Sequence, residues 1–291
     1  MTNISKQWFY AFSLIALVLI MSLISLTSIA SQTEQLSKQN LDLGQYQVVH
    51  QQTLDFIDDN LSGITYSRDT DTLFAIINNP EQIVELDKNG QLLRRMKLHG
   101  FIDTEGITYI GQQQFAISQE RQRSVSIVNI TGETQALNAQ DYKQFSLSSQ
   151  SQNNLGLEGI AWAPDVGLFV SNEKSPSEVI RIPMALFTGI QQQTKDYGDI
   201  MPKYYKNLPV TDISGLHFYK QTQQLFVLSD ESRQLLLIND DGEIQSQFNF
   251  DPWLFGIGRD VEQPEGITMD EQGHIYIVGE PNVLLVMSPS S

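Results

Sequence analysis

Five short segments of the sequence place a serine or a glutamate directly before a glycine. The segments are LSGITY (61–66), TEGITY (104–109), LEGIAW (157–162), ISGLHF (213–218) and PEGITM (264–269). Three of them supply a carboxylate, from Glu105, Glu158 and Glu265. Carboxylates that gather at one place can hold a hard divalent cation, because Ca²⁺ takes about six to eight oxygen ligands. The chemistry therefore depends on whether the fold brings these acids together.

Each of these motifs begins a unit that recurs through the sequence. The motif glycines, Gly63, Gly106, Gly159, Gly215 and Gly266, are 43, 53, 56 and 51 residues apart. Each glycine is followed by an alternating apolar pattern, which is typical of a β-strand, and then by a polar turn. A second predicted strand follows, and each contains one buried aromatic side chain: Phe74, Phe115, Phe169, Phe226 or Tyr276.

The repeating units have the length and strand content of propeller blades. Third strands are predicted at 81–87, 124–130, 178–182, 234–240 and 282–287, and fourth strands at 91–98 and 243–250. Units of about 40–55 residues with four antiparallel strands are typical of β-propellers. The predicted fold is all-β, a five-bladed β-propeller of four-stranded antiparallel blades, over residues 44–291. Segment 44–54 is expected to supply the missing fourth strand of the last blade and so to close the ring.

The propeller fold predicts where the acids lie. The first strand of each blade lines the central channel, and the second strand returns beside it. Residues that precede the glycines and residues at the ends of the second strands are therefore expected at one channel mouth. The second group contains Asn78, Gln119, Glu173, Asp230 and Glu280, and the acids Glu120 and Glu231 follow directly in their repeats.

A ring of carboxylates at this mouth would need a cation. Three carboxylates about 7 Å apart repel one another by roughly 2.4 kcal/mol per pair at an effective dielectric constant of about 20. Ca²⁺ fits an all-oxygen site better than Mg²⁺, which prefers tighter geometry, or Zn²⁺, which prefers nitrogen and sulfur. The candidate metal ligands are Glu105, Glu158, Glu265, Glu173, Asp230, Glu280 and Glu120.

Two simpler interpretations of these acids stay open. The glutamates beside the glycines could accept backbone hydrogen bonds where each strand starts. The acids after the second strands could be ordinary turn residues, because Asp, Asn and Pro favour turns. The charge balance excludes one class of partner, since 34 acidic residues face 18 basic ones, a net charge of −16, and nucleic-acid binding needs clustered Lys and Arg. The sequence has no cysteine, which excludes disulfides and thiolate metal sites.

The N-terminus contains a candidate membrane segment. Residues 8–30 carry no charge, and as one helix they are long enough to cross a hydrocarbon layer of about 30 Å. We expect residues 1–30 to be a single-pass inner-membrane anchor, residues 31–43 to be a linker, and the C-terminal domain to lie in the periplasm. The alternative is a signal peptide that is cleaved near Ala30, after which the protein would be released into the periplasm.

The blade segments resemble a known family. LSGITYSRDTDTLFAIINNPEQIVELDKNG, FIDTEGITYIGQQQFAISQERQRSVSIVNI, SGLHFYKQTQQLFVLSDESRQLLLINDDG and PEGITMDEQGHIYIVGEPN are similar to the SdiA-regulated, YjiK-like bacterial proteins over residues 45–288. The resemblance implies an N-terminal membrane segment and a five-bladed propeller, distantly related to NHL-repeat proteins, with a shared calcium site. At matching positions it implies roles for Glu105, Glu158 and Glu265, and for Glu173, Asp230 and Glu280.

Two functions remain after these observations. The first is a membrane-tethered periplasmic binding or scaffold module that Ca²⁺ stabilises at the central channel. The alternative is a metal-dependent hydrolase of the lactone or phosphoester class, in which the channel metal would activate water. A serine hydrolase is not supported, because the sequence has no G-x-S-x-G motif. The resemblance implies no particular activity, so the sequence leaves open whether the protein is an enzyme.

Overall fold

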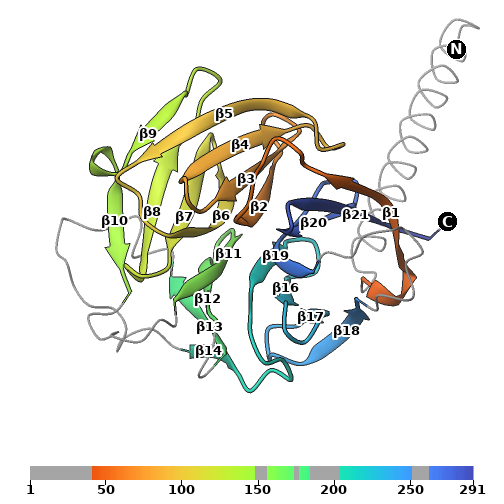
Figure 1. Ribbon diagram of the computed structural model, residues 1–291. Coiled ribbons are helices and arrows are strands. Elements are labelled where there is room, and N and C mark those ends of the chain that lie inside the picture. The colour runs from red at the N-terminus through yellow and green to blue at the C-terminus, as the bar shows by residue number, and fades with distance from the viewer. Residues whose placement is uncertain (1–40, 148–155, 174–176, 184–202, 251–261, 291) are drawn as a thin grey trace, which may run out of the picture. The chain divides into compact units, whose positions relative to one another are not determined.

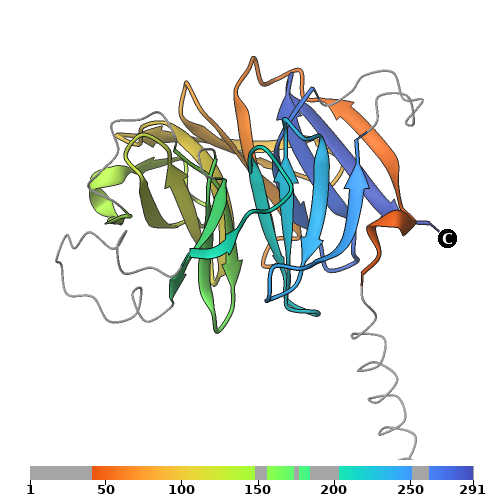
Figure 2. The same cartoon turned by 90° about the horizontal axis from the view of Figure 1, so that it is seen from below.

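Five β-sheets stand around a common axis in the computed structural model (Figure 1). The structure describes residues 41–147, 156–173, 177–183, 203–250 and 262–290. Four of the sheets have four strands, and one has five. Within each sheet the strands lie side by side and twist, as the strands of residues 215–249, coloured cyan to blue, do in Figure 2. The five-bladed, all-β propeller that the sequence predicts is confirmed.

The blades follow one another along the chain. Blade 1 contains β2 (Leu61–Ser67), β3 (Thr72–Ile77), β4 (Gln82–Leu86), β5 (Leu92–His99) and the added strand β9 (Ala136–Asn138). Blade 2 contains β6 (Thr104–Gly111), β7 (Gln114–Gln119), β8 (Ser124–Asn129) and β10 (Lys143–Ser146). Blade 3 contains β11 (Leu157–Ala163), β12 (Gly167–Asn172), β13 (Glu178–Pro183) and β14 (Lys203–Lys206).

The last two blades complete the ring. Blade 4 contains β15 (Gly215–Tyr219), β16 (Gln224–Ser229), β17 (Gln234–Ile238) and β18 (Ile244–Asn249). Blade 5 contains β19 (Gln263–Met269), β20 (Ile275–Glu280), β21 (Val283–Pro289) and the N-terminal strand β1 (Tyr46–Thr53). Strand β1 pairs with β21 from Tyr46 opposite Pro289 to Thr53 opposite Val283. The predicted closure of the ring by the two ends of the chain is therefore confirmed.

Short helical turns of the 3-10 type flank two of the strands. The turn η1 (Leu43–Gln45) precedes β1, and η2 (Ala139–Asp141) precedes β10. The side chain of Leu43 is fully buried, and its backbone N–H donates to Ser246 Oγ on β18 at 2.8 Å. This turn therefore links blade 5 to blade 4.

The motif glycines bring the first strands of neighbouring blades into direct contact. A Cβ atom at Gly63 would lie 2.6 Å from the carbonyl oxygen of Glu105 in the next blade, and one at Gly106 would lie 2.5 Å from that of Glu158. A Cβ at Gly266, in the last blade, would lie 2.7 Å from Cα of Gly63 in the first. Because these neighbours are backbone atoms, only glycine fits at the centre of the ring.

The aromatic residues of the second strands form the core between blades, as predicted. Phe74, Phe115, Phe169 and Phe226 are at most 1% exposed, and Tyr276 is 2% exposed. The rings of Phe74 and Phe115 come from adjacent blades, with centroids 4.7 Å apart. Burial of such rings is a large apolar contribution to stability and holds each blade against the next.

Three strands of the structure do not appear in the prediction. Strands β10 and β14 are short and polar, so no alternating pattern marks them. Strand β9 pairs in parallel with β5, which no local pattern can indicate. The predicted membrane segment lies outside the described residues. Within the part of the chain that the structure describes, no helix is long and apolar enough to cross a membrane.

Candidate metal centre

A β-bulge lies beside the motif glycine in four of the five first strands. In β2, Leu61 pairs with Ile77 and Gly63 pairs with Ile76, so Ser62 is an extra residue. In β19, Glu265 is extra in the same way, and β6 and β11 have the same register shift next to their glutamates. A bulge leaves one residue outside the ladder and redirects its side chain. This geometry explains why Glu105, Glu158 and Glu265 can precede their glycines without entering the apolar core.

The bulged residues face a cavity of about 280 Å³ at one mouth of the channel. Its walls come from the starts of the first strands and the ends of the second strands. The lining residues are Asn60, Ser62, Asn78, Glu105, Glu158, Glu173, Asp212, Ser214, Asp230, Gln263, Glu265 and Glu280. Six of the seven predicted ligand residues therefore lie around one cavity, and their role in metal binding stays a prediction.

The seventh predicted residue, Glu120, lies between two groups of acids. Its carboxylate forms one group with Glu158 and Glu173, in which one oxygen from each residue lies within 4.8 Å of the others. It forms a second group of the same size with Asp103 and Glu105. Glu120 follows Gln119, the last residue of β7, and takes part in the acidic mouth in its place.

Gln119 is buried away from the cavity. Its side chain is fully buried, and its Oε1 accepts a hydrogen bond from the backbone N–H of Ile102 at 3.0 Å. Its Nε2 lies 3.4 Å from Ser124 Oγ. The expectation that Gln119 lies with the acids at the mouth is therefore wrong, because hydrogen bonds to Ile102 and to Ser124 on β8 hold this amide inside the blade.

Two acids at this mouth were not among the predicted ligands. Asp103 is 7% exposed, and Arg121 Nε lies 3.0 Å from its Oδ2. Asp212 is 2% exposed, and its carboxylate accepts the backbone N–H groups of Asp230 at 3.0 Å and Glu231 at 3.1 Å. Both acids stand three positions before a motif glycine, and this spacing is the signal that could have identified them.

Hydrogen bonds fix the carboxylate of blade 2. Asn78, at the end of β3, donates from Nδ2 to Glu105 Oε1 at 2.6 Å and to Asp103 Oδ1 at 3.2 Å. The amide therefore joins blade 1 to the acids of blade 2. Since Asn78 was predicted to lie with the acids at this mouth, its position is confirmed.

The acids of the mouth have raised pKa values. Burial, together with the charges of Asp103 and Glu120, raises the pKa of Glu105 to about 8. Burial likewise raises the pKa of Glu265 to about 8 and that of Glu120 to about 7, with neighbouring carboxylates adding to both. Burial and four neighbouring glutamates hold the pKa of Glu158 well above its usual range. The protein alone does not stabilise this much negative charge.

A family model described as SdiA-regulated matches residues 38–288 of the chain. Solved structures with the same fold include the glutaminyl cyclase of Myxococcus xanthus, with a TM-score of 0.57, 11% identity, and coverage of 84% of this chain and 95% of that chain. The calcium-binding protein regucalcin of Agrobacterium tumefaciens matches with a TM-score of 0.52 and 9% identity. That match covers 83% of this chain and 94% of that chain.

A streptogramin B lyase also matches, with a TM-score of 0.45 and 14% identity. The match covers 79% of this chain and 65% of that chain, so this chain spans less than two thirds of the length of that relative. At these identities, the two likenesses with higher TM-scores establish the propeller fold alone.

Proposed function

This chain belongs to the SdiA-regulated family, and we propose that it binds Ca²⁺ at the acidic channel mouth and acts as a membrane-tethered periplasmic binding or scaffold module. One observation carries the cation site. Oxygen atoms of Glu120, Glu158 and Glu173 all lie within 4.8 Å of one another, although the three acids come from two blades.

The spacing of these oxygens fits one calcium ion. Ca²⁺–oxygen distances are about 2.3–2.6 Å, so two oxygens bound to the same ion lie at most about 5 Å apart. The remaining lining groups are amides, hydroxyls and carboxylates, all of which offer oxygen. An ion of charge +2 would also offset the repulsion that accompanies the raised pKa values of Glu105 and Glu158. The calcium-binding protein regucalcin has the same fold and supports the choice of ion only by analogy.

The group around Glu158 suits the ion better than the group around Asp103. Asp103 already has a cationic neighbour, because Arg121 Nε lies 3.0 Å from its Oδ2. It also accepts a hydrogen bond from Asn78. Glu158 forms no ion pair with a described residue. We therefore assign Glu120, Glu158 and Glu173 as the first ligands, with Glu105 beside them and Glu265, Asp230 and Glu280 around the rest of the cavity.

Metal analysis and thermal unfolding of the purified full chain test the calcium site. We expect about one Ca²⁺ per chain by elemental analysis and a lower melting temperature after chelation. Saturation at 100 times the dissociation constant stabilises a protein by about 2.7 kcal/mol. For a domain of this size, that corresponds to a shift of roughly 5–11 °C.

Matched glutamine variants distinguish loss of the calcium site from the general effect of removing one negative charge. Glu158→Gln should lose most of the calcium-dependent shift. Glu133→Gln removes the same charge at an exposed position on the turn after β8 and should keep the shift. Equal shifts in both variants, or no bound calcium in the wild type, would show that the acids are hydrogen-bond acceptors without a cation.

The location of the protein is a separate part of the proposal. The uncharged run at 8–30 supports a membrane anchor, with the propeller on the periplasmic side. Full-length protein should stay in carbonate-washed membranes and become sensitive to protease only after the outer membrane is permeabilised. Recovery in the soluble periplasmic fraction, with a new N-terminus near Ser31, would instead indicate a cleaved signal peptide.

A metal-dependent hydrolase is the second candidate, and the opposite wall of the cavity favours it. In the calcium-free protein, burial and the charge of Asp230 raise the pKa of Glu265 to about 8, so this carboxyl group can take up or release a proton near neutral pH. The cavity of about 280 Å³ leaves room for a small substrate beside a metal. Calcium-dependent hydrolysis of lactones or phosphodiesters that Glu265→Gln abolishes, while calcium binding persists, would support an enzyme over a binding module.

A further inference from the structure

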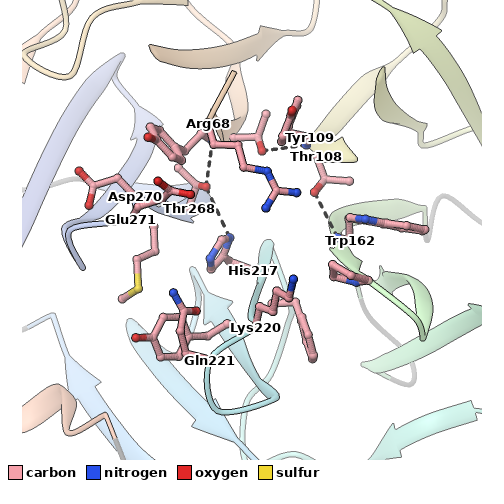
Figure 3. A pocket seen from close by; sticks show the side chains of 16 residues that line it. Arg68, Thr108, Tyr109, Trp162, His217, Lys220, Gln221, Thr268, Asp270 and Glu271 are labelled. Carbon is pink, nitrogen blue, oxygen red and sulfur yellow. Dashed lines mark hydrogen bonds between the residues drawn. The ribbon is translucent and has the colours of Figure 1, made fainter. Parts of the chain in front are cut away.

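The other mouth of the channel contains a second pocket that the acidic mouth does not reach. Between the two mouths, the motif glycines and the apolar residues after them narrow the channel to a cavity of about 10 Å³. Beyond this constriction, the far ends of the first strands enclose a pocket of about 150 Å³ (Figure 3). A ligand in one pocket therefore cannot contact a ligand in the other.

Threonine hydroxyls surround the inner end of this second pocket. Thr65 Oγ1 accepts the backbone N–H of Tyr109 at 2.9 Å, and Thr108 Oγ1 accepts that of Trp162 at 3.2 Å. Each bond joins one blade to the next. A hydroxyl that accepts a hydrogen bond still has its own proton to donate. Among the described residues, neither hydroxyl has an acceptor for that proton, so both are available donors at this mouth.

Two cationic side chains stand over the same pocket. Arg68 follows β2 in blade 1, and Lys220 follows β15 in blade 4, so they approach from opposite sides (Figure 3). The Arg68 guanidinium lies over the ring of Tyr109, 5.7 Å from its centroid, and Figure 3 shows it pointing toward the middle of the pocket. Neither cation forms an ion pair with a carboxylate of the described residues.

The acid in the pocket wall does not neutralise these cations. Asp270 has a fully buried side chain, and its oxygens accept the N–H groups of Gln272 and His274, both at 2.9 Å. Its Oδ2 also accepts the hydroxyl of Tyr276 at 2.9 Å. Its Oδ2 also lies 3.7 Å from Lys88 Nζ of blade 1, so the hydrogen-bonding capacity of Asp270 is used by groups other than Arg68 and Lys220. The other acid at this mouth, Glu271, is exposed to solvent.

The imidazole of His217 contributes a neutral polar group to the pocket. It occupies the strand position that is threonine in three other blades, and its Nδ1 lies 3.5 Å from Thr268 Oγ1. Burial lowers the pKa of His217 to about 4, so the ring is neutral at physiological pH. Aromatic side chains of Tyr109 and Trp162 form the adjacent wall, to which the flat body of a ligand could bind.

We propose that this second pocket binds a small organic anion that has a flat apolar body and a carboxylate group. The carboxylate would lie between Arg68 and Lys220, and the body against Trp162. Arg68 and Lys220 place two positive charges at this mouth, although the chain as a whole has a net charge of −16 and repels anions. The pocket is smaller than the roughly 300–1,000 Å³ that holds drug-sized ligands, so the ligand is the size of one aromatic ring with its acid.

Ligand-observed NMR on the full chain tests this assignment with three probes of one shape. Benzoate carries the carboxylate, benzyl alcohol is neutral and benzylamine is cationic. We expect benzoate to bind and the other two to bind at least about tenfold more weakly, because one charge-assisted hydrogen bond is worth about a factor of ten in affinity. Arg68→Gln and Lys220→Gln should each weaken benzoate binding by about tenfold.

Matched charge variants on the fourth strand of blade 1 serve as controls. Arg95→Gln and Lys97→Gln remove the same charges at exposed positions of β5, outside the pocket, and should leave benzoate binding unchanged. Absence of benzoate binding at millimolar concentration would overturn the proposal. Equal binding of benzyl alcohol, or equal losses in all four variants, would also overturn it. Chelation of calcium should not alter benzoate binding, because the two mouths are separated, so failure of either proposal is recognisable by itself.

Discussion

Gly156 makes room for the side chain of Glu120. A Cβ atom at position 156 would lie 1.6 Å from Cγ of Glu120 and 2.6 Å from its Oε1. The glutamate of blade 2 therefore occupies the space that a side chain at the start of blade 3 would fill. This relationship brings the Glu120 carboxylate to within 4.8 Å of Glu158 and Glu173. In the other blades, the position three residues before the glycine carries Asn60, Asp103, Asp212 or Gln263.

Gly156→Ala should therefore weaken calcium binding without unfolding the protein. The three atoms nearest to the added methyl group all belong to the side chain of Glu120, which is flexible and can rotate away, so the propeller should tolerate it. Mutation of a residue that positions a metal ligand typically lowers metal affinity by about 10–100-fold, and we expect a loss in this range by titration calorimetry.

A double-mutant cycle checks that the effect passes through Glu120. Glu120→Gln alone should weaken binding to a similar degree, and Gly156→Ala should add little in that background. Additive losses would show that Gly156 acts on the site by another route. Gly132→Ala is the control, because a Cβ at Gly132 meets no atom within 4 Å.

The contact that closes the ring gives a prediction about stability. A Cβ at Gly266 would lie 2.7 Å from both Cα of Gly63 and the backbone N of Ile64, and backbone atoms cannot move aside. Gly266→Ala should therefore cost about 1–3 kcal/mol or more of unfolding free energy, the usual cost of overpacking a well-packed core.

Urea denaturation measures this change against Gly132→Ala. The control residue has open space and an ordinary backbone angle, so alanine there should change stability little or raise it by about 0.4–1 kcal/mol. Equal stability of the two variants would mean that the first strands can separate at the centre of the ring.

Threonines that join neighbouring blades give a third prediction. Thr65 is 5% exposed, and its Oγ1 accepts the backbone N–H of Tyr109 in the next blade at 2.9 Å. Thr65→Val keeps the shape and leaves this N–H without an acceptor, which should cost about 1–3 kcal/mol. Thr70→Val changes an exposed threonine of the same blade and should stay within about 0.5 kcal/mol of wild type by chemical denaturation.

The fold follows from local patterns that recur. The spaced glycines predict five blades, because each glycine contacts the first strand of the next blade, and the aromatic side chains predict the core between blades. The predicted pairing of the chain ends is correct because each end lacked one partner strand. The polar strands β10 and β14 are not predictable in this way, because segments of four residues are too short to show alternation.

The positions of the candidate site residues along the strands can be predicted from the sequence, but the directions of some of their side chains cannot. Glu158 and Glu265 line the cavity because each directly precedes a motif glycine, where the register shift of the strand redirects the acidic side chain. The direction of Gln119, by contrast, depends on hydrogen bonds to Ile102 and Ser124, which the sequence of one strand does not reveal. The second pocket was missed because its residues come from the far ends of first strands, where no charge pattern repeats.

The raised pKa values predict an unusual pH dependence for the calcium-free protein. The pKa values of Glu105 and Glu265 rise from 4.5 to about 8, and that of Glu120 rises to about 7. Between pH 4.5 and about pH 8, the folded state therefore binds more protons than the unfolded state. Stability therefore falls as the pH rises from about 5 to about 8, which is opposite to the usual behaviour of paired carboxylates.

Thermal unfolding in the presence of a chelator measures this dependence. The melting temperature should decrease by several degrees between pH 5 and pH 8, and saturating Ca²⁺ should remove most of the decrease, because the ion replaces the protons. Glu105→Gln stays neutral at every pH and should flatten the profile, whereas Glu133→Gln, at an exposed position, should not. A melting temperature that rises with pH in the absence of calcium would show that these carboxylates are stabilised as anions by the protein itself. The need for a cation at this mouth would then disappear.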